Sequence, residues 1–165
     1  MPGRFLSGAL RGAFRKQDGQ LYVVGTRGWT SNAIREGSFQ RVRYTGRKLY
    51  APIGFAARRN GIRITFTEPL KREAAEDTGS YGLEQWNYKY SKGYGSKEYS
   101  AISPDVVGHD PVEVESAKLD DERTVFLRIP QLRPVHQMAI KYNLASADGQ
   151  PVRGELFLTI HSLTE

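Results

Sequence analysis

Apolar residues recur at every second position over much of the chain, which is the period of a β-strand with one buried face. The alternation is clearest in residues 52–57 and 62–66, and Asn60-Gly61 provides a turn between these two runs. Only residues 71–77 favour a helix, of about two turns at most. The chain is therefore predicted to be all-β. Further strands are expected at residues 81–90, 111–119, 124–129, 137–144 and 155–163.

Turn signals separate these expected strands. The acidic stretch 120–122 and the Asp148-Gly149 pair are two of them, and the second is typical of a tight hairpin. Many short strands with turns at a spacing of roughly 8–12 residues are typical of a β-sandwich, in which each strand gives one face to a shared core. Residues 48–165 are therefore predicted to form an immunoglobulin-like β-sandwich.

The first 47 residues have a different pattern. An Asp18-Gly19 turn leads into the strand-forming run 21–24, and residues 38–46 alternate as a second strand. A hairpin with a long connection follows from this pattern, and it is too small to fold alone. We expect residues 1–47 to form a β-hairpin arm that precedes the sandwich.

An aromatic segment, WNYKYSKGYGSKEYS, occupies residues 86–100. Trp86, Tyr88 and Tyr90 lie at alternate positions, so in a strand they share one face. With the rings outward, the intervening Asn and Lys would face the core at a cost of several kcal/mol. The three rings are therefore predicted to face the core. Tyr94 lies between two glycines at the expected turn, where its ring would be exposed.

This interpretation of the aromatic segment requires an irregular strand. The apolar positions before it, Tyr81 and Leu83, are odd-numbered, whereas Trp86 and the tyrosines that follow it are even-numbered. One extra residue in a strand reverses which face the following side chains occupy. We therefore expect a β-bulge near residues 84–85.

The charge of the chain is unevenly distributed. Residues 1–72 carry 15 Lys and Arg against 3 Asp and Glu, a net of +12, and residues 73–165 carry 9 against 15, a net of −6. Twelve of the early cations are Arg, which suits paired contacts with carboxylate, sulfate or phosphate. The basic half either meets an acidic partner or faces water or another part of the same protein.

The chain contains no cysteine. Disulfides, thiolate chemistry, cysteine-rich zinc sites and covalent haem attachment are therefore excluded within these residues. No stretch approaches the roughly 18 apolar residues of a membrane-spanning helix. Residues 1–16 lack an uninterrupted apolar run, so no signal peptide is expected in this chain.

No constellation of residues predicts catalysis or metal binding. The three histidines, His109, His136 and His161, lie in separate segments without the spacing that puts two ligands on one face. The acidic side chains of residues 73–77 are typical of a solvated helix face. The serines of residues 91–100 have no neighbouring histidine to activate them. We expect neither an enzyme nor a metal site.

Candidate binding residues come from the densest basic and aromatic cluster, which contains Trp29, Arg41, Arg43 and Tyr44. Anionic polysaccharides and nucleic acids both combine negative charge with surfaces that stack on aromatic rings. The same pattern also fits a half-buried strand whose outer face is charged. Trp29, Arg41, Arg43 and the exposed Tyr94 are the candidate ligand-binding residues. The half-buried strand is the favoured interpretation; if the cluster does bind a ligand, we expect an anionic polysaccharide and not a nucleic acid.

Two stretches resemble known modules. The segment NGIRITFTEPLKREAAEDTGSY, residues 60–81, is similar to the opening of a bacterial immunoglobulin-like module. The segment DGQLYVVGTRGW, residues 18–29, followed by RVRYTG, residues 41–46, resembles the last strands of a sugar-dehydrogenase-type β-propeller. In this order, and joined to WNYKYSKGYGS, they resemble the C-terminal region of large exported c-type cytochrome proteins of planctomycete-type bacteria.

The resemblance implies that the chain is a fragment of an exported, haem-binding electron-transfer protein linked to carbohydrate oxidation, located in the periplasm or outside the cell. Most of the propeller and the Cys-x-x-Cys-His motif are missing, so no cofactor is expected here and haem belongs only to the fuller parent protein. The implied role is a non-catalytic structural or interaction module whose partners are other domains of the parent.

Two other functions stay open. One is a carbohydrate-binding module for anionic polysaccharide. The other is an arm that completes a sugar-dehydrogenase propeller, which would need catalytic residues from outside this chain.

Overall fold

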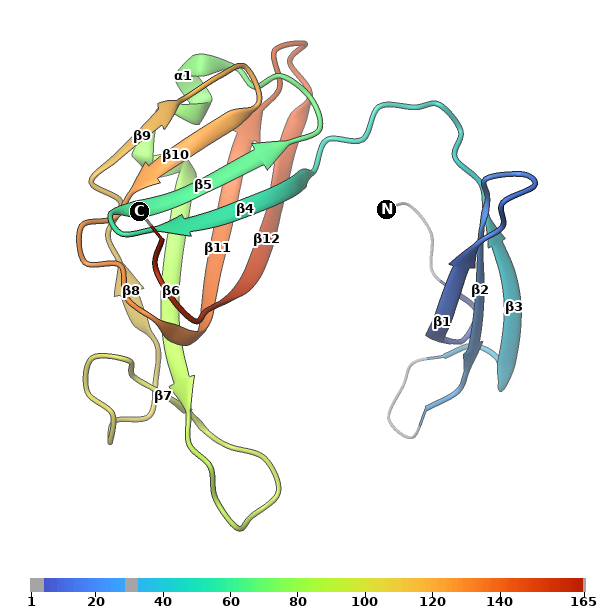
Figure 1. Cartoon of the computed structure of the whole chain (residues 1–165), viewed down its shortest axis with the longest axis horizontal. Coiled ribbons are helices and arrows are strands. Elements are labelled where there is room, and N and C mark those ends of the chain that lie inside the picture. Colours follow the sequence, from blue (N-terminus) through green and yellow to red (C-terminus); the bar gives the residue numbers. More distant parts are fainter. Residues whose placement is uncertain (1–4, 29–32, 165) are drawn as a thin grey trace. The chain divides into compact units, whose positions relative to one another are not determined.

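The structure is a computed structural model that describes residues 5–28 and 33–164. The chain divides into two compact units, Met1–Arg47 (unit 1) and Lys48–Glu165 (unit 2). All ladders between the named strands are antiparallel (Figure 1). In the described part of the chain, helix is limited to α1 (Arg72–Ala75) and the single 3₁₀ turn η1 (Thr78–Ser80). The predicted all-β class is confirmed.

Unit 2 is an immunoglobulin-like sandwich of two sheets, as predicted. The first sheet has the strand order β4-β5-β10-β9, and the second has the order β12-β11-β6-β7, with β8 also paired to β6. The first sheet consists of β4 (Pro52–Arg58), β5 (Gly61–Phe66), β10 (Thr124–Arg128) and β9 (Ser116–Leu119). The second consists of β12 (Pro151–Ile160), β11 (Val135–Ala145), β6 (Tyr81–Tyr88), β7 (Glu98–Tyr99) and β8 (Asp110–Val112).

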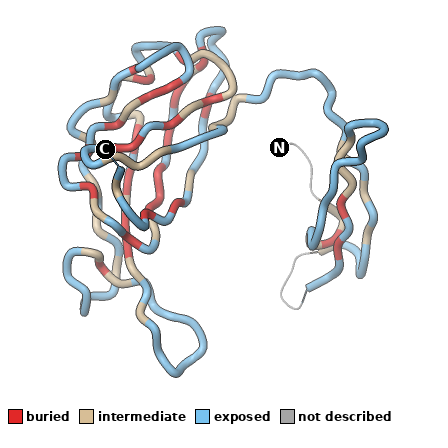
Figure 2. Tube along the Cα trace, viewed as in Figure 1, coloured by how far each residue is buried: buried red, intermediate tan, exposed pale blue. Residues whose placement is uncertain are grey.

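The core of unit 2 lies between these two sheets and takes every second side chain from the central strands. Figure 2 shows the buried residues along the strands of unit 2, with exposed chain at the loops. Ile62 and Ile64 of β5 are fully buried, and Ile140 of β11 is fully buried in the opposite sheet. The rings of Phe66 and Tyr142 meet edge to face at 5.5 Å across this core.

The expected strand 111–119 is two strands in different sheets. β8 pairs with β6 in the second sheet, whereas β9 pairs with β10 in the first. The residues between them cross from one sheet to the other, and Val112 and Val114 pack against the core on the way. The prediction of one strand was wrong because alternation along the sequence does not indicate where a chain changes sheets.

The predicted bulge near residues 84–85 is absent. β6 pairs with β11 without a register shift from Tyr81 to Trp86. Tyr81, Leu83 and Gln85 of this strand are buried on the core side. By the alternation of a regular strand, Trp86 therefore lies on the outer face of the second sheet.

The prediction that three aromatic rings face the core is corrected accordingly. Tyr88 is 38% exposed and Tyr90, beyond the end of β6, is fully exposed. Trp86 is only 4% exposed, so its burial is confirmed, although its partners are not those of the core between the sheets.

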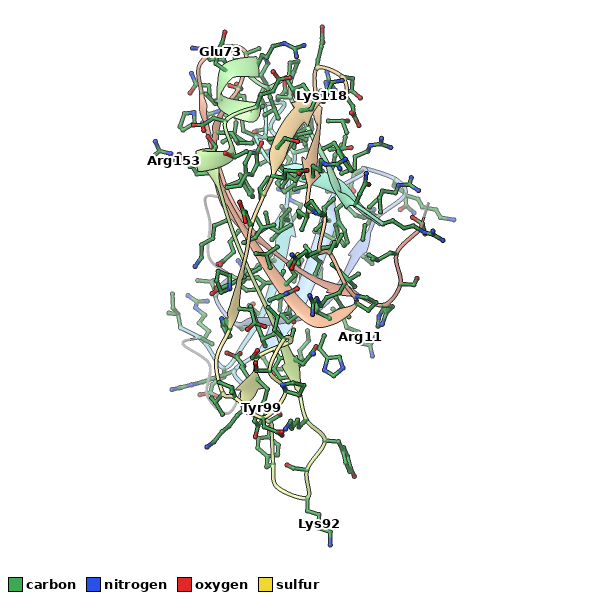
Figure 3. All side chains as sticks on the ribbon, turned by 90° about the vertical axis from the view of Figure 1, so that its left-hand side faces the viewer. Arg11, Glu73, Lys92, Tyr99, Lys118 and Arg153 are labelled. Atoms are coloured by element: carbon green, nitrogen blue, oxygen red, sulfur yellow. The ribbon has the colours of Figure 1, made fainter. Side chains whose placement is uncertain are left out.

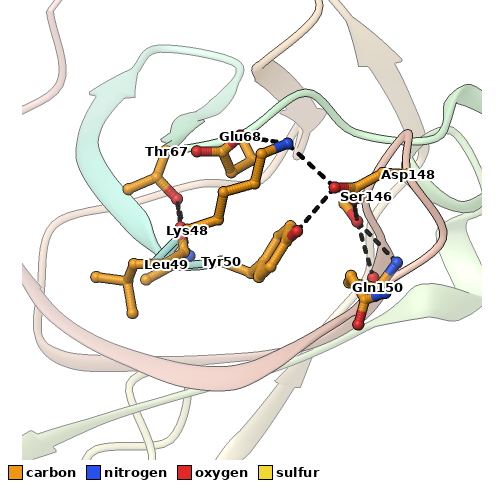
Figure 4. Close-up of polar contacts among 9 residues, drawn as sticks. Lys48, Leu49, Tyr50, Thr67, Glu68, Ser146, Asp148 and Gln150 are labelled. Atoms are coloured by element: carbon orange, nitrogen blue, oxygen red, sulfur yellow. Dashed lines mark hydrogen bonds and ion pairs between the residues drawn. The ribbon is translucent and has the colours of Figure 1, made fainter. Parts of the chain in front are cut away.

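The start of unit 2 is fastened to the turn between β11 and β12 through one carboxylate (Figure 4). Asp148 Oδ2 accepts hydrogen bonds from Lys48 Nζ at 3.1 Å and Tyr50 Oη at 2.8 Å. Ser146 Oγ lies 2.5 Å from Asp148 Oδ1. The hydrogen bonds from Ser146 and Tyr50 are the main causes that lower the pKa of Asp148 well below its ordinary value. The carboxylate therefore stays charged at neutral pH and holds residues 48–50 in place.

Unit 1 is a three-stranded sheet of order β1-β2-β3, formed by β1 (Gly8–Phe14), β2 (Leu21–Thr26) and β3 (Gly37–Val42). The expected hairpin corresponds to β2 and β3, and β1 is an additional strand. Pairing of Gly8 with Thr26 begins this extra ladder, and its register shifts between Ala9 and Arg11. This strand was not predicted because the glycines and arginine of its sequence interrupt the alternation of apolar and polar residues.

Candidate functional site

Two loops that follow β6 lie at one end of the sandwich. The first, residues 89–97, connects β6 to β7, and the second, residues 100–109, connects β7 to β8. We call these two loops together the loop end. Figure 1 shows the first loop below the label β7 and the second loop to the left of that label, and Figure 3 shows Lys92 far out on the first loop, beyond Tyr99.

The two loops are joined by Lys89. Its Nζ lies 2.7 Å from Asp105 Oδ1 in the second loop, and it also lies 4.6 Å from the centre of the Tyr99 ring. The backbone N–H of Lys89 donates to Ser96 Oγ at 2.9 Å, which closes the first loop on itself. One ion pair, one cation–π contact and one local hydrogen bond therefore give the loop end a defined form.

The first loop presents aromatic rings and cations to the solvent. Tyr90 and Tyr94 are fully exposed, so the predicted exposure of Tyr94 is confirmed. Gly95 has a φ of 79°, a backbone conformation that favours glycine, and it forms the turn beside Tyr94. Lys92 and Lys97 lie in the same loop and are exposed. This combination of flat rings and positive charge is the chemistry expected for an anionic ligand that stacks.

The second loop presents aliphatic side chains on a rigid base. Ile102, Val106 and Val107 are exposed. Asp110 fixes the loop from inside, because its carboxylate accepts from Ser100 Oγ at 2.6 Å and from the N–H of Ala101 at 2.6 Å. The Ile102 N–H also donates to Asp110, at 3.0 Å. The start of the loop that carries these aliphatic side chains is therefore held in place by hydrogen bonds to Asp110.

A stacked pair of rings supports the loop end from the sheet. The indole of Trp86 lies parallel to the imidazole of His109, with the ring centroids 3.8 Å apart. Phe157 of β12 approaches Trp86 edge-on at 6.5 Å, and Trp86 Nε1 donates to Tyr88 Oη at 3.0 Å. His109 comes from the second loop, so the stack attaches that loop to the outer face of β6.

Two carboxylates hold the imidazole of His109 in this position. Glu84 Oε2 lies 3.1 Å from Nδ1, and Glu98 Oε2 lies 2.6 Å from Nε2. Partial burial by itself would lower the pKa of His109, but the contacts with Glu98 and Glu84 raise it above its ordinary value. The hydrogen bond from His109 is also the main cause that lowers the pKa of Glu84. Through Glu84 and Glu98 the imidazole bridges two strands, β6 and β7, and these contacts are stronger when it is protonated.

A second histidine, His136, makes hydrogen bonds to β6. His136 Nδ1 accepts from the Tyr88 N–H at 2.9 Å, and the His136 N–H donates to Asn87 Oδ1 at 2.8 Å. Within residues 5–28 and 33–164, no group of three or more His, Cys, Asp and Glu is placed to hold a metal ion. None of the helices in these residues has the length and apolar composition needed to cross a membrane.

The candidate ligand-binding residues predicted from the sequence are distributed over both units. Arg41 and Arg43 belong to unit 1, whereas Tyr94 belongs to unit 2, and Trp29 lies outside the described residues. Arg41 pairs with Tyr22 in the sheet of unit 1 and is exposed. Sequence reasoning missed Tyr90 as an exposed ring and the pairing of Trp86 with His109. The position of His109 in a loop gave no sign of its aromatic partner.

No protein-family model matches this chain, and no curated protein matches it. Among solved structures, the chain is similar to the crystal structure of CopC from Methylosinus trichosporium OB3b. The two are 14% identical, with a TM-score of 0.37, and the match covers 68% of this chain and 94% of that chain.

Proposed function

We propose that this chain is a non-catalytic structural and interaction module, and that unit 1 packs against other domains of a larger protein. The single observation that carries this proposal is the exposure of large apolar side chains on both faces of the unit 1 sheet. Directly paired residues of antiparallel strands share a face. Their registers therefore assign the exposed rings to faces.

One face of the unit 1 sheet carries Phe39 and the other carries Phe14. Phe39 pairs with Val24 and stacks on Tyr22 at 5.6 Å, and it is 70% exposed. Phe14 pairs with Leu21 on the opposite face and is 73% exposed. In Figure 2 most of unit 1 is coloured as exposed. A sheet that needs cover on both faces is suited to lie between two others, as a blade lies between its neighbours in a β-propeller.

The larger protein that we propose is the one implied by the resemblance of residues 18–46 and 60–81, an exported haem-binding electron-transfer protein linked to carbohydrate oxidation. Haem and catalysis belong to its other domains in this proposal. The location is then the periplasm or the outside of the cell.

The gene sequence upstream of Met1 tests this proposal directly. We expect the reading frame to continue into further propeller strands. In the extended protein, the backbone amides of β1 and β3 should exchange hydrogen more slowly than in the 165-residue chain, because neighbouring blades would cover Phe14 and Phe39. An in-frame stop codon directly upstream, or unchanged exchange in an extended protein, contradicts the proposal.

A second candidate function is the binding of anionic polysaccharide at the loop end. The observation that favours it is the full exposure of Tyr90 and Tyr94 beside Lys92 and Lys97. Rings that protrude in this way stack on sugars, and the lysines would meet sulfate or uronate groups.

Affinity electrophoresis in a gel that contains chondroitin sulfate distinguishes the two candidates. If the loop end binds, Tyr94→Ala and Lys92→Gln should each reduce the retardation of the chain. Lys118→Gln is the matched control for Lys92→Gln, because Lys118 is also an exposed lysine and lies at the opposite end of unit 2 in Figure 3. Equal retardation of all variants and of wild type would contradict binding at the loop end.

A further inference from the structure

A pocket of about 320 Å³ opens beside the loop end, where the core between the two sheets reaches the surface. Gln85 of β6, Ile102 of the second loop, Pro111 of β8 and Arg133 are among its lining residues. Pockets that hold small ligands begin at about this volume, and they combine apolar walls with a few polar groups. The pocket belongs entirely to unit 2.

Gln85 is the first polar group of this pocket without a partner. It is 4% exposed and lies on the core side of β6, next to the apolar position Leu83. No described residue donates a hydrogen bond to its Oε1. A buried amide oxygen without a donor is unfavourable, and native structures contain few of them. Rotation of the side-chain amide would turn either of its polar atoms toward the pocket.

Arg133 is the second such group. Its Nε is buried, and no described residue accepts a hydrogen bond from it. Arg133 contributes to lowering the pKa of Asp110, but the oxygens of Asp110 already accept from Ser100, Ala101 and Ile102. A partly buried guanidinium is suited to a carboxylate, which matches its planar arrangement of donors.

The rest of the pocket adds acceptors and apolar surface. Glu113 and Glu115 both line it, and Glu115 is occupied by a contact with Arg128 Nε. Glu113 therefore remains as an acceptor for hydroxyl groups. Ile129 and Pro130 supply apolar walls.

We propose that this pocket binds a small carboxylate that also carries hydroxyl groups, the chemistry of a uronic acid monosaccharide. The carboxylate pairs with Arg133, and the hydroxyl groups donate to Gln85 Oε1 and Glu113. The C–H faces of the ligand lie against Ile129 and Pro130. This site is separate from the exposed tyrosines, so it does not rest on the binding of polysaccharide at the loop end or on the packing of unit 1.

Titration of the ¹⁵N-labelled chain with D-glucuronate, followed by NMR, tests the proposal. We expect saturable shifts of the Arg133 Nε–H and Gln85 side-chain amide signals. D-glucose lacks the carboxylate and acetate lacks the hydroxyl groups, so each should produce at least tenfold weaker binding. The absence of saturable shifts with D-glucuronate, or equal binding of D-glucose or acetate, overturns the proposal.

Two variants separate binding from folding. Gln85→Leu removes an unpaired buried amide while it keeps the volume, so it should fold at least as stably as wild type and lose at least tenfold in affinity. Arg133→Met should lose a similar factor. Arg123→Met, at an exposed arginine outside the pocket, and Tyr94→Ala should bind D-glucuronate as wild type does. If Gln85→Leu and Arg133→Met both retain wild-type affinity, the site is not this pocket.

Discussion

The indole of Trp86 and the imidazole of His109 lie face to face, with planes only 7° apart. This contact joins the outer face of β6 to the loop that precedes β8. It also explains how a strand can bury a tryptophan on the side that faces solvent, because the histidine covers the ring that the sandwich core does not reach. The loop end therefore depends on a contact outside the main core.

Replacement of Trp86 by alanine should destabilise the chain by about 3 kcal/mol, at the lower end for a large aromatic residue, because the site is covered by a loop that can collapse. Chemical denaturation measures this difference. Tyr94→Ala is the matched control and should change stability little, because its ring is fully exposed. Near-wild-type stability of Trp86→Ala would show that the stack contributes little.

The contacts of His109 should make the attachment of the loop end depend on pH. The pKa of this imidazole is raised above the ordinary value of 6.5 by Glu98 and Glu84, although burial opposes the shift. Below about pH 6.5 the imidazole is protonated in both the folded and the unfolded chain, so the stabilisation is fully present. It is lost as the pH rises through the folded pKa.

We therefore expect the stability difference between wild type and His109→Gln to be larger at pH 6 than at pH 9. An NMR titration of the His109 ring should show a midpoint above 6.5. His161→Gln, at an exposed histidine of the same unit, is the matched control. A midpoint at or below 6.5 would contradict the proposed role of the two glutamates.

The fold of unit 2 follows from the sequence because its strands are regular where they are buried. Residues 62–66 alternate as β5 does, and the Asp148-Gly149 turn connects β11 to β12, with a φ of 79° at Gly149. Local pattern is sufficient for such strands, since one face is apolar and the turn residues are specific. The all-β class and the sandwich could be predicted from the sequence for this reason.

The candidate site could not be predicted as well, because it depends on contacts between residues that are distant in the sequence. The even-numbered rings of β6 suggested a bulge, whereas the strand is regular and its outer face is covered by His109 from the second loop. The pocket depends on Gln85 and Arg133, which are 48 positions apart by their numbers and share no sequence pattern. Neither pairing can be predicted from spacing along the chain.

The junction through Asp148 should stabilise the chain at neutral pH. Because its pKa is lowered by hydrogen bonds from Ser146 and Tyr50, its contribution is present above the ordinary value of 3.8 and is lost as the pH falls through the folded pKa. Asp148→Asn should lower the melting temperature at pH 7 and speed hydrogen exchange at the Ala51 amide. Asp105→Asn breaks an exposed ion pair with Lys89 and should have little effect on stability. Equal melting temperatures for the two variants would contradict an anchoring role for Asp148.

Unit 1 should open and be digested before unit 2. Its sheet buries few large side chains, and Phe14 and Phe39 remain 73% and 70% exposed. Trypsin under native conditions should therefore cut first at the arginines before Pro52, and a fragment that begins near Lys48 should persist with the melting temperature of the sandwich. The Trp86→Ala variant serves as a comparison. It lacks the stack with His109 that supports the loop end, so trypsin should cut it within residues 89–109 as well as in unit 1. If unit 1 stays resistant as long as unit 2 does, its exposed rings are covered in the 165-residue chain itself, and the proposal that another domain covers them fails.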